Sequence, residues 1–153
     1  SLEYQVKAAF LYNFAKFVTW PEDAFSGEDA PFVFCIVGRD PFGDSLEKVL
    51  EGRRAADRPI VVRRGPDPES LGRCHLMFIG GSEDARVARH LRQASAQPVL
   101  TVGETEAFER AGGMIRLVVA DKRVRFDINA KAADVARLKL SSQLLKLARK
   151  VVR

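Results

Sequence analysis

The sequence lacks most of the features that assign a protein to a function class at first sight. No run of about 18 apolar residues is free of charge, so no segment is expected to span a bilayer. Only two cysteines occur, which is too few for a zinc site, since such sites take about four ligands at short spacings. Glycine-rich nucleotide signatures and the common motifs of nucleic-acid binders are absent. We therefore expect no cofactor, no metal and no nucleic-acid partner.

What is present is the composition of one folded domain. The 153 residues are 46% hydrophobic and 29% charged, which provides enough apolar surface for a core and argues against a disordered chain. Repeats and low-complexity linkers do not occur, so residues 1–153 are expected to form a single domain. The first residues carry no cleavable export signal, so the protein is either cytosolic or has had its signal removed.

Short apolar runs alternate with helix-length segments along most of the chain. The runs that resemble buried strands are residues 32–37, 60–62, 75–79 and 98–102. This alternation predicts an α/β fold with a mostly parallel sheet of about five to six strands and helices on both faces. Residues 41–50 and 82–95 are expected to be two of these helices, with Ser82 as the cap of the second.

The N-terminal segment, residues 3–20, has the length of a helix and stops before Pro21, which cannot continue one. Its polar residues are scattered around the helical wheel, so its apolar surface is wider than one stripe. Such a helix is either covered on several sides within its own fold or covers a second protein chain.

The C-terminal part of the chain departs from the parallel pattern. Residues 114–119 and 124–128 predict an antiparallel hairpin with one wet face, on which Arg125 and Asp127 would meet solvent or a partner. A helix that begins at about Ser141 is expected to close the chain.

The charged residues are concentrated in three segments. Lys and Arg number 25 against 20 Asp and Glu, a net charge of +5. Residues 53–64 hold five arginines and one aspartate, residues 137–153 hold six basic residues and no acid, and residues 22–29 are acidic. Charge runs are usually solvated surfaces, and we expect that here; the alternative is a contact with phosphate or an acidic protein.

Catalytic groups are hard to assemble from this sequence. Open α/β sheets bind ligands beyond the carboxyl ends of their strands, which directs attention to residues 38–40, 80–82 and 103–104. The Gly-Gly-Ser at 80–82 is either a tight turn or an anion site. Neither His75 nor His90 has a nucleophile in an obvious position, and helix capping explains the acidic pair Asp40 and Asp44. We expect no enzyme.

Seven segments, spread in order over nearly the whole chain, carry a family resemblance. They are residues 3–17 (EYQVKAAFLYNFAKF) with Trp20-Pro21, 38–43, 74–79, 98–102, 112–115, 124–129 and 141–148. Together they resemble the YfiR family of bacterial periplasmic proteins. The resemblance implies a periplasmic, non-enzymatic regulator that restrains a membrane-anchored diguanylate cyclase of the YfiN type by contact with its periplasmic portion. A YfiB-like outer-membrane lipoprotein would sequester the regulator.

Two other functions stay open at this stage. Domains related to this family also occur beside sensor kinases, so the protein is alternatively a small-molecule-binding periplasmic sensor that acts on a histidine kinase. A cytosolic nucleic-acid binder is favoured only by the isoelectric point near 9.5.

The resemblance also bears on the cysteines and on the partner surface. Cys35 and Cys74 match a cysteine pair of the family, and a periplasmic protein can keep such a disulfide, although free thiols remain the alternative. A second pair known in the family is missing, so a redox switch that depends on it is not expected.

Aromatic and arginine residues often anchor interfaces, so partner contact is expected through exposed aromatics near the end of the first helix and through the basic last helix. These candidates are Phe14, Phe17, Trp20, Arg149 and Lys150. The broad apolar face of the first helix leaves room for an isologous homodimer.

Overall fold

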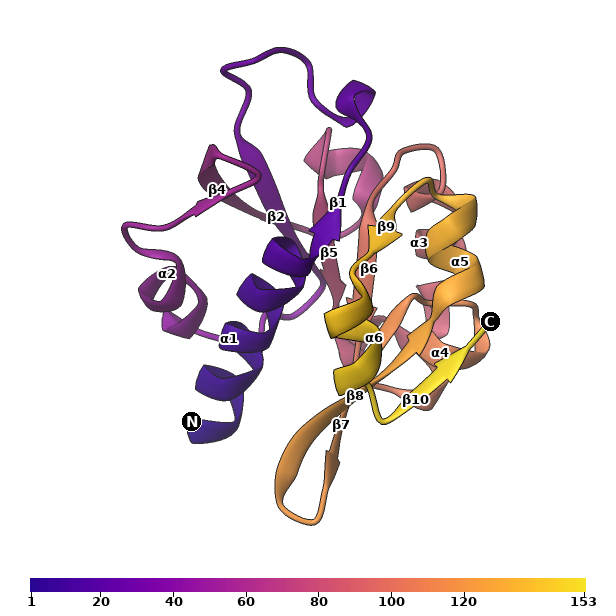
Figure 1. Cartoon of the computed structure of the whole chain (residues 1–153). Helices are drawn as coiled ribbons and strands as arrows, with labels where there is room; N and C mark the ends of the chain where they lie inside the picture. The colour runs from indigo at the N-terminus through magenta and orange to yellow at the C-terminus, as the bar shows by residue number, and fades with distance from the viewer.

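A sheet of eight strands forms the middle layer of the computed structural model, which describes residues 1–153 (Figure 1). In their order across the sheet, the strands are β10 (Lys150–Val152), β8 (Arg123–Asn129), β7 (Ile115–Ala120), β6 (Leu100–Gly103), β5 (Leu76–Ile79), β2 (Phe32–Val37), β4 (Arg58–Gly65) and β3 (Arg54–Ala55). A separate antiparallel pair consists of β1 (Val18–Thr19) and β9 (Lys139–Leu140).

The five strands in the centre, β4, β2, β5, β6 and β7, are all parallel. β8 returns antiparallel to β7, so the predicted hairpin is confirmed. The predicted α/β fold with a mostly parallel sheet is confirmed as well. The strand count is larger than five to six, because the edge strands β3 and β10 have only two and three residues and leave no periodic pattern in the sequence.

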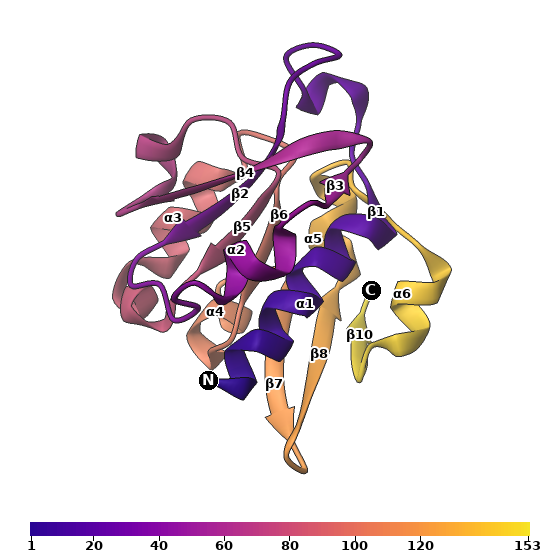
Figure 2. The same cartoon turned by 90° about the vertical axis from the view of Figure 1, so that its left-hand side faces the viewer.

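Helices cover both faces of the sheet. They are α1 (Leu2–Phe17), α2 (Ser45–Leu50), α3 (Val87–Ala94), α4 (Glu106–Arg110), α5 (Ala130–Val135) and α6 (Ser142–Leu147). Three 3-10 turns add to them: η1 (Glu22–Ala24), η2 (Pro68–Leu71) and η3 (Gly81–Arg86). α1 and α2 pack on one face, and α3 and α4 on the other (Figure 2). None of these helices has both the length and the apolar character that crossing a membrane requires.

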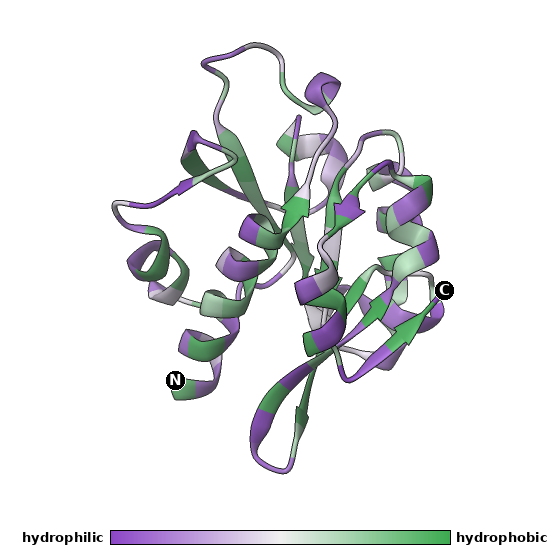
Figure 3. Ribbon diagram, in the orientation of Figure 1, coloured by the Kyte–Doolittle hydropathy of each residue, from purple (hydrophilic) through white to green (hydrophobic).

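The strand β2 shows why its sequence is apolar without interruption. Phe34 and Ile36 belong to the core under α1, whereas Cys35 and Val37 belong to the core under α3. Successive side chains of a strand point to opposite faces, so a strand covered on both sides needs apolar residues at every position. β2 and β5, which are apolar at every position, are accordingly among the most hydrophobic strands of the molecule (Figure 3).

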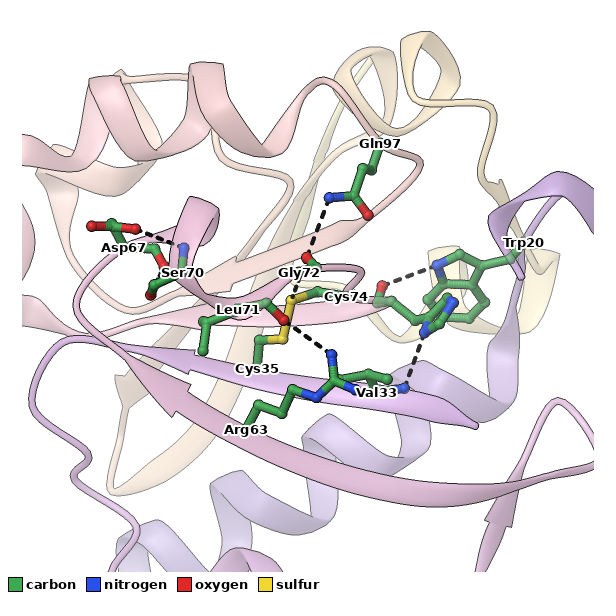
Figure 4. The surroundings of a disulfide bond; sticks show 11 residues. Trp20, Val33, Cys35, Arg63, Asp67, Ser70, Leu71, Gly72, Cys74 and Gln97 are labelled. Carbon is green, nitrogen blue, oxygen red and sulfur yellow. Dashed lines mark hydrogen bonds between the residues drawn. A yellow bond between two sulfur atoms is a disulfide. The ribbon is translucent and has the colours of Figure 1, made fainter. Parts of the chain in front are cut away.

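A disulfide joins Cys35 to Cys74 within the core on the α3 side (Figure 4). Their Cα atoms are 6.0 Å apart, as bridge geometry requires. Cys35 lies in β2, and Cys74 lies in the segment that leads into the neighbouring strand β5. The bridge therefore fastens the two strands at the middle of the sheet, and the bonded alternative is confirmed.

Three predicted helix boundaries are wrong. The first helix ends at Phe17, because the β-branched residues of β1 pair with β9. The helix expected over residues 41–50 begins only at Ser45. The helix expected over residues 82–95 begins as the 3-10 turn η3, and Ser82 does not cap it.

The predicted C-terminal helix is also too long. α6 ends at Leu147, and the residues after it form β10, parallel to β8. The backbone N–H of Arg149 donates to the carbonyl of Phe126 at 2.8 Å. The backbone groups of these residues thus form their hydrogen bonds with the edge of the sheet instead of within a longer helix. This pairing outweighs the spacing of apolar residues, which by itself suits a helix.

Candidate functional site

The loops after β2 and β5, at the point where the strand order reverses, pack directly on one another. The backbone N–H of Arg39 donates to Oγ of Ser82 at 3.0 Å, and that of Gly80 donates to the carbonyl of Val37 at 2.9 Å. A Cβ at Gly80 would lie 2.7 Å from the Arg39 carbonyl oxygen, so the close approach requires glycine. These contacts hold the two loops together at the place where a doubly wound sheet usually binds its ligand. The turn alternative for residues 80–82 fits this packing.

Glu83 forms a second set of contacts at the same edge of the sheet. Its carboxylate accepts hydrogen bonds from Nε of Arg86 at 3.0 Å and from Nε2 of the fully buried His90 at 2.8 Å. The bonds from Arg86 and then from His90 lower the pKa of Glu83 to about 2. His90 therefore pairs with an acid, and the pair anchors η3 to α3.

Glu104, in the loop after β6, is tied to the first helix. Its carboxylate accepts hydrogen bonds from Nζ of Lys7 at 2.5 Å and from the Tyr4 hydroxyl at 2.9 Å. Lys7 is buried and also pairs with Glu3 at 2.6 Å. Burial alone would lower the pKa of Lys7, but the hydrogen bonds to Glu104 and Glu3 raise it above its ordinary value. All three strand-end loops are thus held by contacts within the chain.

Each of the five arginines in the basic segment 53–64 donates a hydrogen bond within the chain, although all of them except Arg58 are exposed. Arg64 binds Asp40 at 2.6 Å and Glu47 at 2.6 and 2.9 Å. Arg58 donates to three carbonyls of residues 27–30, and its guanidinium lies 3.8 Å from the ring centre of Phe25. Arg58 therefore positions the acidic loop that precedes β2, and Arg64 is the member of the segment that is paired with two carboxylates. No group of three or more His, Cys, Asp or Glu residues is arranged to hold a metal.

His75 fixes the other side of that loop. Its Nδ1 accepts the N–H of Val33, and its Nε2 donates to the carbonyl of Ala24. Its ring stacks on Phe25 with the ring centres 4.2 Å apart, and the indole N–H of Trp20 donates to the His75 carbonyl at 2.9 Å. His75 is therefore a structural residue with both ring nitrogens in use.

The expectation that Phe14 and Trp20 are exposed is wrong, because only 1% and 7% of their surfaces reach solvent. Phe14 packs edge-on against Phe126, with the ring centres 5.1 Å apart. The apolar surface of the middle and end of α1 is thus used within the fold, whereas Leu2 and Val6 in its first turns stay exposed. Phe17 is half-buried, and its part in partner binding stays a prediction.

Arg149 directly precedes β10 and Lys150 is its first residue, so the expectation that both lie in a helix is wrong. Both oxygens of Asp127 accept hydrogen bonds from the Arg149 guanidinium, at 2.9 and 2.7 Å. Asp127 is only 4% exposed, so its expected place on a wet face is wrong. The bond from Arg149 lowers the pKa of Asp127, against the effect of burial. Lys150 is exposed and forms no salt bridge.

A hollow that sequence reasoning missed lies between α3 and α5. Its volume is about 360 Å³, and its lining is mostly apolar, with Leu91, Met114 and Val135 among its walls. Thr101 and Asn129 supply polar atoms, but each already accepts a backbone N–H. The walls come from three separate segments, residues 91–101, 112–114 and 129–136, so no single motif could have indicated the hollow.

Solved structures share the fold at low sequence identity. A conserved domain protein from Vibrio cholerae O1 biovar eltor aligns over 78% of this chain and 54% of its own, with a TM-score of 0.58 and 9% identity. The ABC domain from Streptococcus pneumonia, solved in complex with L-Trp, aligns over 80% of this chain and 55% of its own, with a TM-score of 0.55 and 10% identity. This chain spans about half the length of these two proteins, and the likeness concerns the fold alone.

The sequence itself matches a family over nearly its whole length. The model of the YfiR/HmsC-like family covers residues 4–149. This range contains both cysteines of the disulfide, the three strand-end loops, and Asp127 and Arg149. The chain belongs to the YfiR/HmsC-like family.

Proposed function

We propose that this protein restrains a membrane-anchored diguanylate cyclase of the YfiN type by binding the cyclase's periplasmic portion. Membership in the YfiR/HmsC-like family supports a regulatory role in cyclic-di-GMP signalling in general. The observation that carries the finer proposal is the closed edge of the sheet, where Ser82, Glu83 and Glu104 are all bound to other parts of the chain. Such an edge favours action through the outer surface.

The disulfide supports the periplasm as the compartment. Disulfides form and persist in oxidising compartments, and the Cys35–Cys74 bridge is built into the core, where it joins two central strands. A YfiB-like lipoprotein as a second partner and a homodimer remain predictions.

Inhibition by contact requires a difference in affinity. The regulator must bind the inactive state of the cyclase more tightly than the active one, because equal affinity shifts no population. Phe17, Arg149 and Lys150 keep some surface exposed and are the contact residues that we propose.

The test measures cyclic-di-GMP in a bacterial strain that has a YfiN-type cyclase and no YfiR protein of its own. We expect export of this chain to the periplasm to lower cyclic-di-GMP severalfold. The same chain without an export signal is the matched control, because it never meets the periplasmic portion. Unchanged cyclic-di-GMP in the presence of exported, disulfide-bonded protein would contradict the proposal.

A small-molecule sensor that acts on a histidine kinase is the second candidate, and the hollow between α3 and α5 favours it. Its volume of about 360 Å³ falls in the range of small-ligand sites. A ligand that binds the native state raises the melting temperature, so a thermal-shift screen of metabolites separates the two functions. A Met114→Trp variant that fills the hollow should abolish any such shift.

A further inference from the structure

The β7–β8 hairpin projects beyond the rest of the sheet (Figures 1 and 2). β7 pairs with β6 only through Ile115 and Arg116, and β8 pairs with β10 only from Asp127 onwards. Residues 117–125 are therefore a two-stranded ribbon without a strand on either side. A ribbon of this kind is marginally stable in water unless one of its faces is covered.

One face of this ribbon is apolar beyond the point where the protein covers it. Directly opposed residues of the hairpin share a face, and Leu117–Phe126 and Val119–Val124 are two successive pairs on the α1 side. The first pair is buried, whereas Val119 is 53% exposed. The row of apolar cross-strand pairs thus extends one pair beyond the part of the ribbon that the protein covers.

The first turns of α1 continue the same arrangement. Phe10 meets Phe126 with the ring centres 5.9 Å apart. Four and eight residues earlier, Val6 and Leu2 lie on the same side of the helix and are 37% and 75% exposed. Between them and the Val119–Val124 pair lies a hollow of about 410 Å³. We call this hollow the hairpin groove; its apolar lining is Leu2, Val6, Val119 and Val124.

The rim of the hairpin groove is positively charged. Lys122 and Arg123 line it, are exposed and form no salt bridge or side-chain hydrogen bond. Glu3 also lines it, but its carboxylate is engaged by Lys7. Asp121 precedes Lys122 in the turn and is not part of the lining.

We propose that the hairpin groove receives a helix of another protein whose aliphatic ridge is flanked by Asp and Glu residues. Helices cover the apolar sheet faces elsewhere in this protein. The groove continues the surface on which α1 packs against the sheet. The unpaired Lys122 and Arg123 select an acidic flank. A second copy of the chain is a poorer occupant, because it would bring these cations against each other. A bilayer surface is also a poorer occupant, because it favours apolar side chains that protrude over those that line a hollow. The proposal does not depend on which enzyme the protein controls.

The test uses two designed helical peptides of about 18 residues, roughly five turns. Both carry a stripe of leucines; one is flanked by glutamates and the other by lysines. Fluorescence anisotropy should show the glutamate peptide binding about tenfold more tightly than the lysine peptide. Exchanging both cations, Lys122→Glu with Arg123→Glu, should reverse this preference.

Two valines provide a matched pair of variants. Val119 and Val152 are both strand residues with 53% exposure, but only Val119 lines the groove. Val119→Asp should weaken the binding of the glutamate peptide about tenfold, and Val152→Asp should leave the affinity for that peptide unchanged. Equal weakening by both variants would overturn the proposal. So would the absence of a peptide preference, self-association abolished by Val119→Asp, or binding confined to vesicles that contain phosphatidylglycerol.

Discussion

His75 accepts the backbone N–H of Val33 through Nδ1 at 3.0 Å, while its Nε2 donates to the carbonyl of Ala24 at 2.8 Å. One ring nitrogen must accept, so this arrangement holds the imidazole in its neutral form. Burial lowers the pKa of His75 from 6.5 to about 4. The bond that Nδ1 accepts from Val33 also opposes protonation, whereas the bond that Nε2 donates to Ala24 favours it without offsetting burial.

We predict that the protein loses stability as the pH falls from 6.5 towards 4. In this window the unfolded chain binds a proton that the folded chain does not, so this contribution is complete above pH 6.5 and lost as the pH approaches 4. The loss between about pH 7 and pH 5 should be about 2 kcal/mol in urea unfolding. His75→Gln removes the titrating ring and should flatten the dependence. An unfolding free energy of the wild type that stays constant over this range would contradict the prediction.

The disulfide should contribute strongly to stability. It closes a loop between residues 39 apart, for which chain entropy gives about 4 kcal/mol. Cys35→Ala together with Cys74→Ala should lower the unfolding free energy by about that amount. Reducing agent should destabilise the wild type and leave the double variant unaffected. Alkylation of the unfolded, non-reduced wild type, followed by mass spectrometry, should add no label; two added labels would contradict the bridge.

Gly80 should tolerate no side chain, for want of space. Its φ of −69° is open to any residue, but a Cβ would lie 2.7 Å from the carbonyl oxygen of Arg39. Gly80→Ala should cost about 1 to 3 kcal/mol, as overpacking does elsewhere. Gly81→Ala is the matched control, because its Cβ would meet only the Thr105 methyl group, at 3.4 Å. Equal melting temperatures for the two variants would show that the loops are not packed as described.

Arg149 and Lys150 are adjacent cations with different expected roles. Arg149→Met leaves the buried carboxylate of Asp127 without its partner, so the denaturant midpoint should fall. Lys150→Met removes an exposed side chain without a salt bridge and should leave the midpoint unchanged. A cyclase-repression assay adds the functional readout. Lost repression by Lys150→Met at full stability would support its place at the interface, and full repression would remove it from the proposed contacts.

The sequence predicted the parts of the fold that depend on repeated patterns. The continuous apolar run of residues 32–37 indicates a strand covered on both faces, and β2 has that position. The alternation of residues 124–128 indicates the hairpin strand β8. Such patterns survive because burial of a whole face decides them.

The parts that were missed depend on a partner far away in the sequence. The last residues have helical spacing, but Phe126 offers its carbonyl and Asp127 its carboxylate, and β10 forms instead. The burial of Trp20 depends on the carbonyl of His75, 55 residues away. Local periodicity contains no information on such partners.

The turn of the β7–β8 hairpin constrains how this part of the molecule can change. Asp121 and Lys122 both adopt positive φ angles, 52° and 64°, as a two-residue turn of the hairpin type requires. Inserting one residue into β8 beside this turn would move the side chain of Val124 to the opposite face of the ribbon. The apolar face and the solvent-facing side of the strand would then be exchanged. Evolutionary lengthening or shortening of this arm is therefore expected to proceed by two residues per strand at a time.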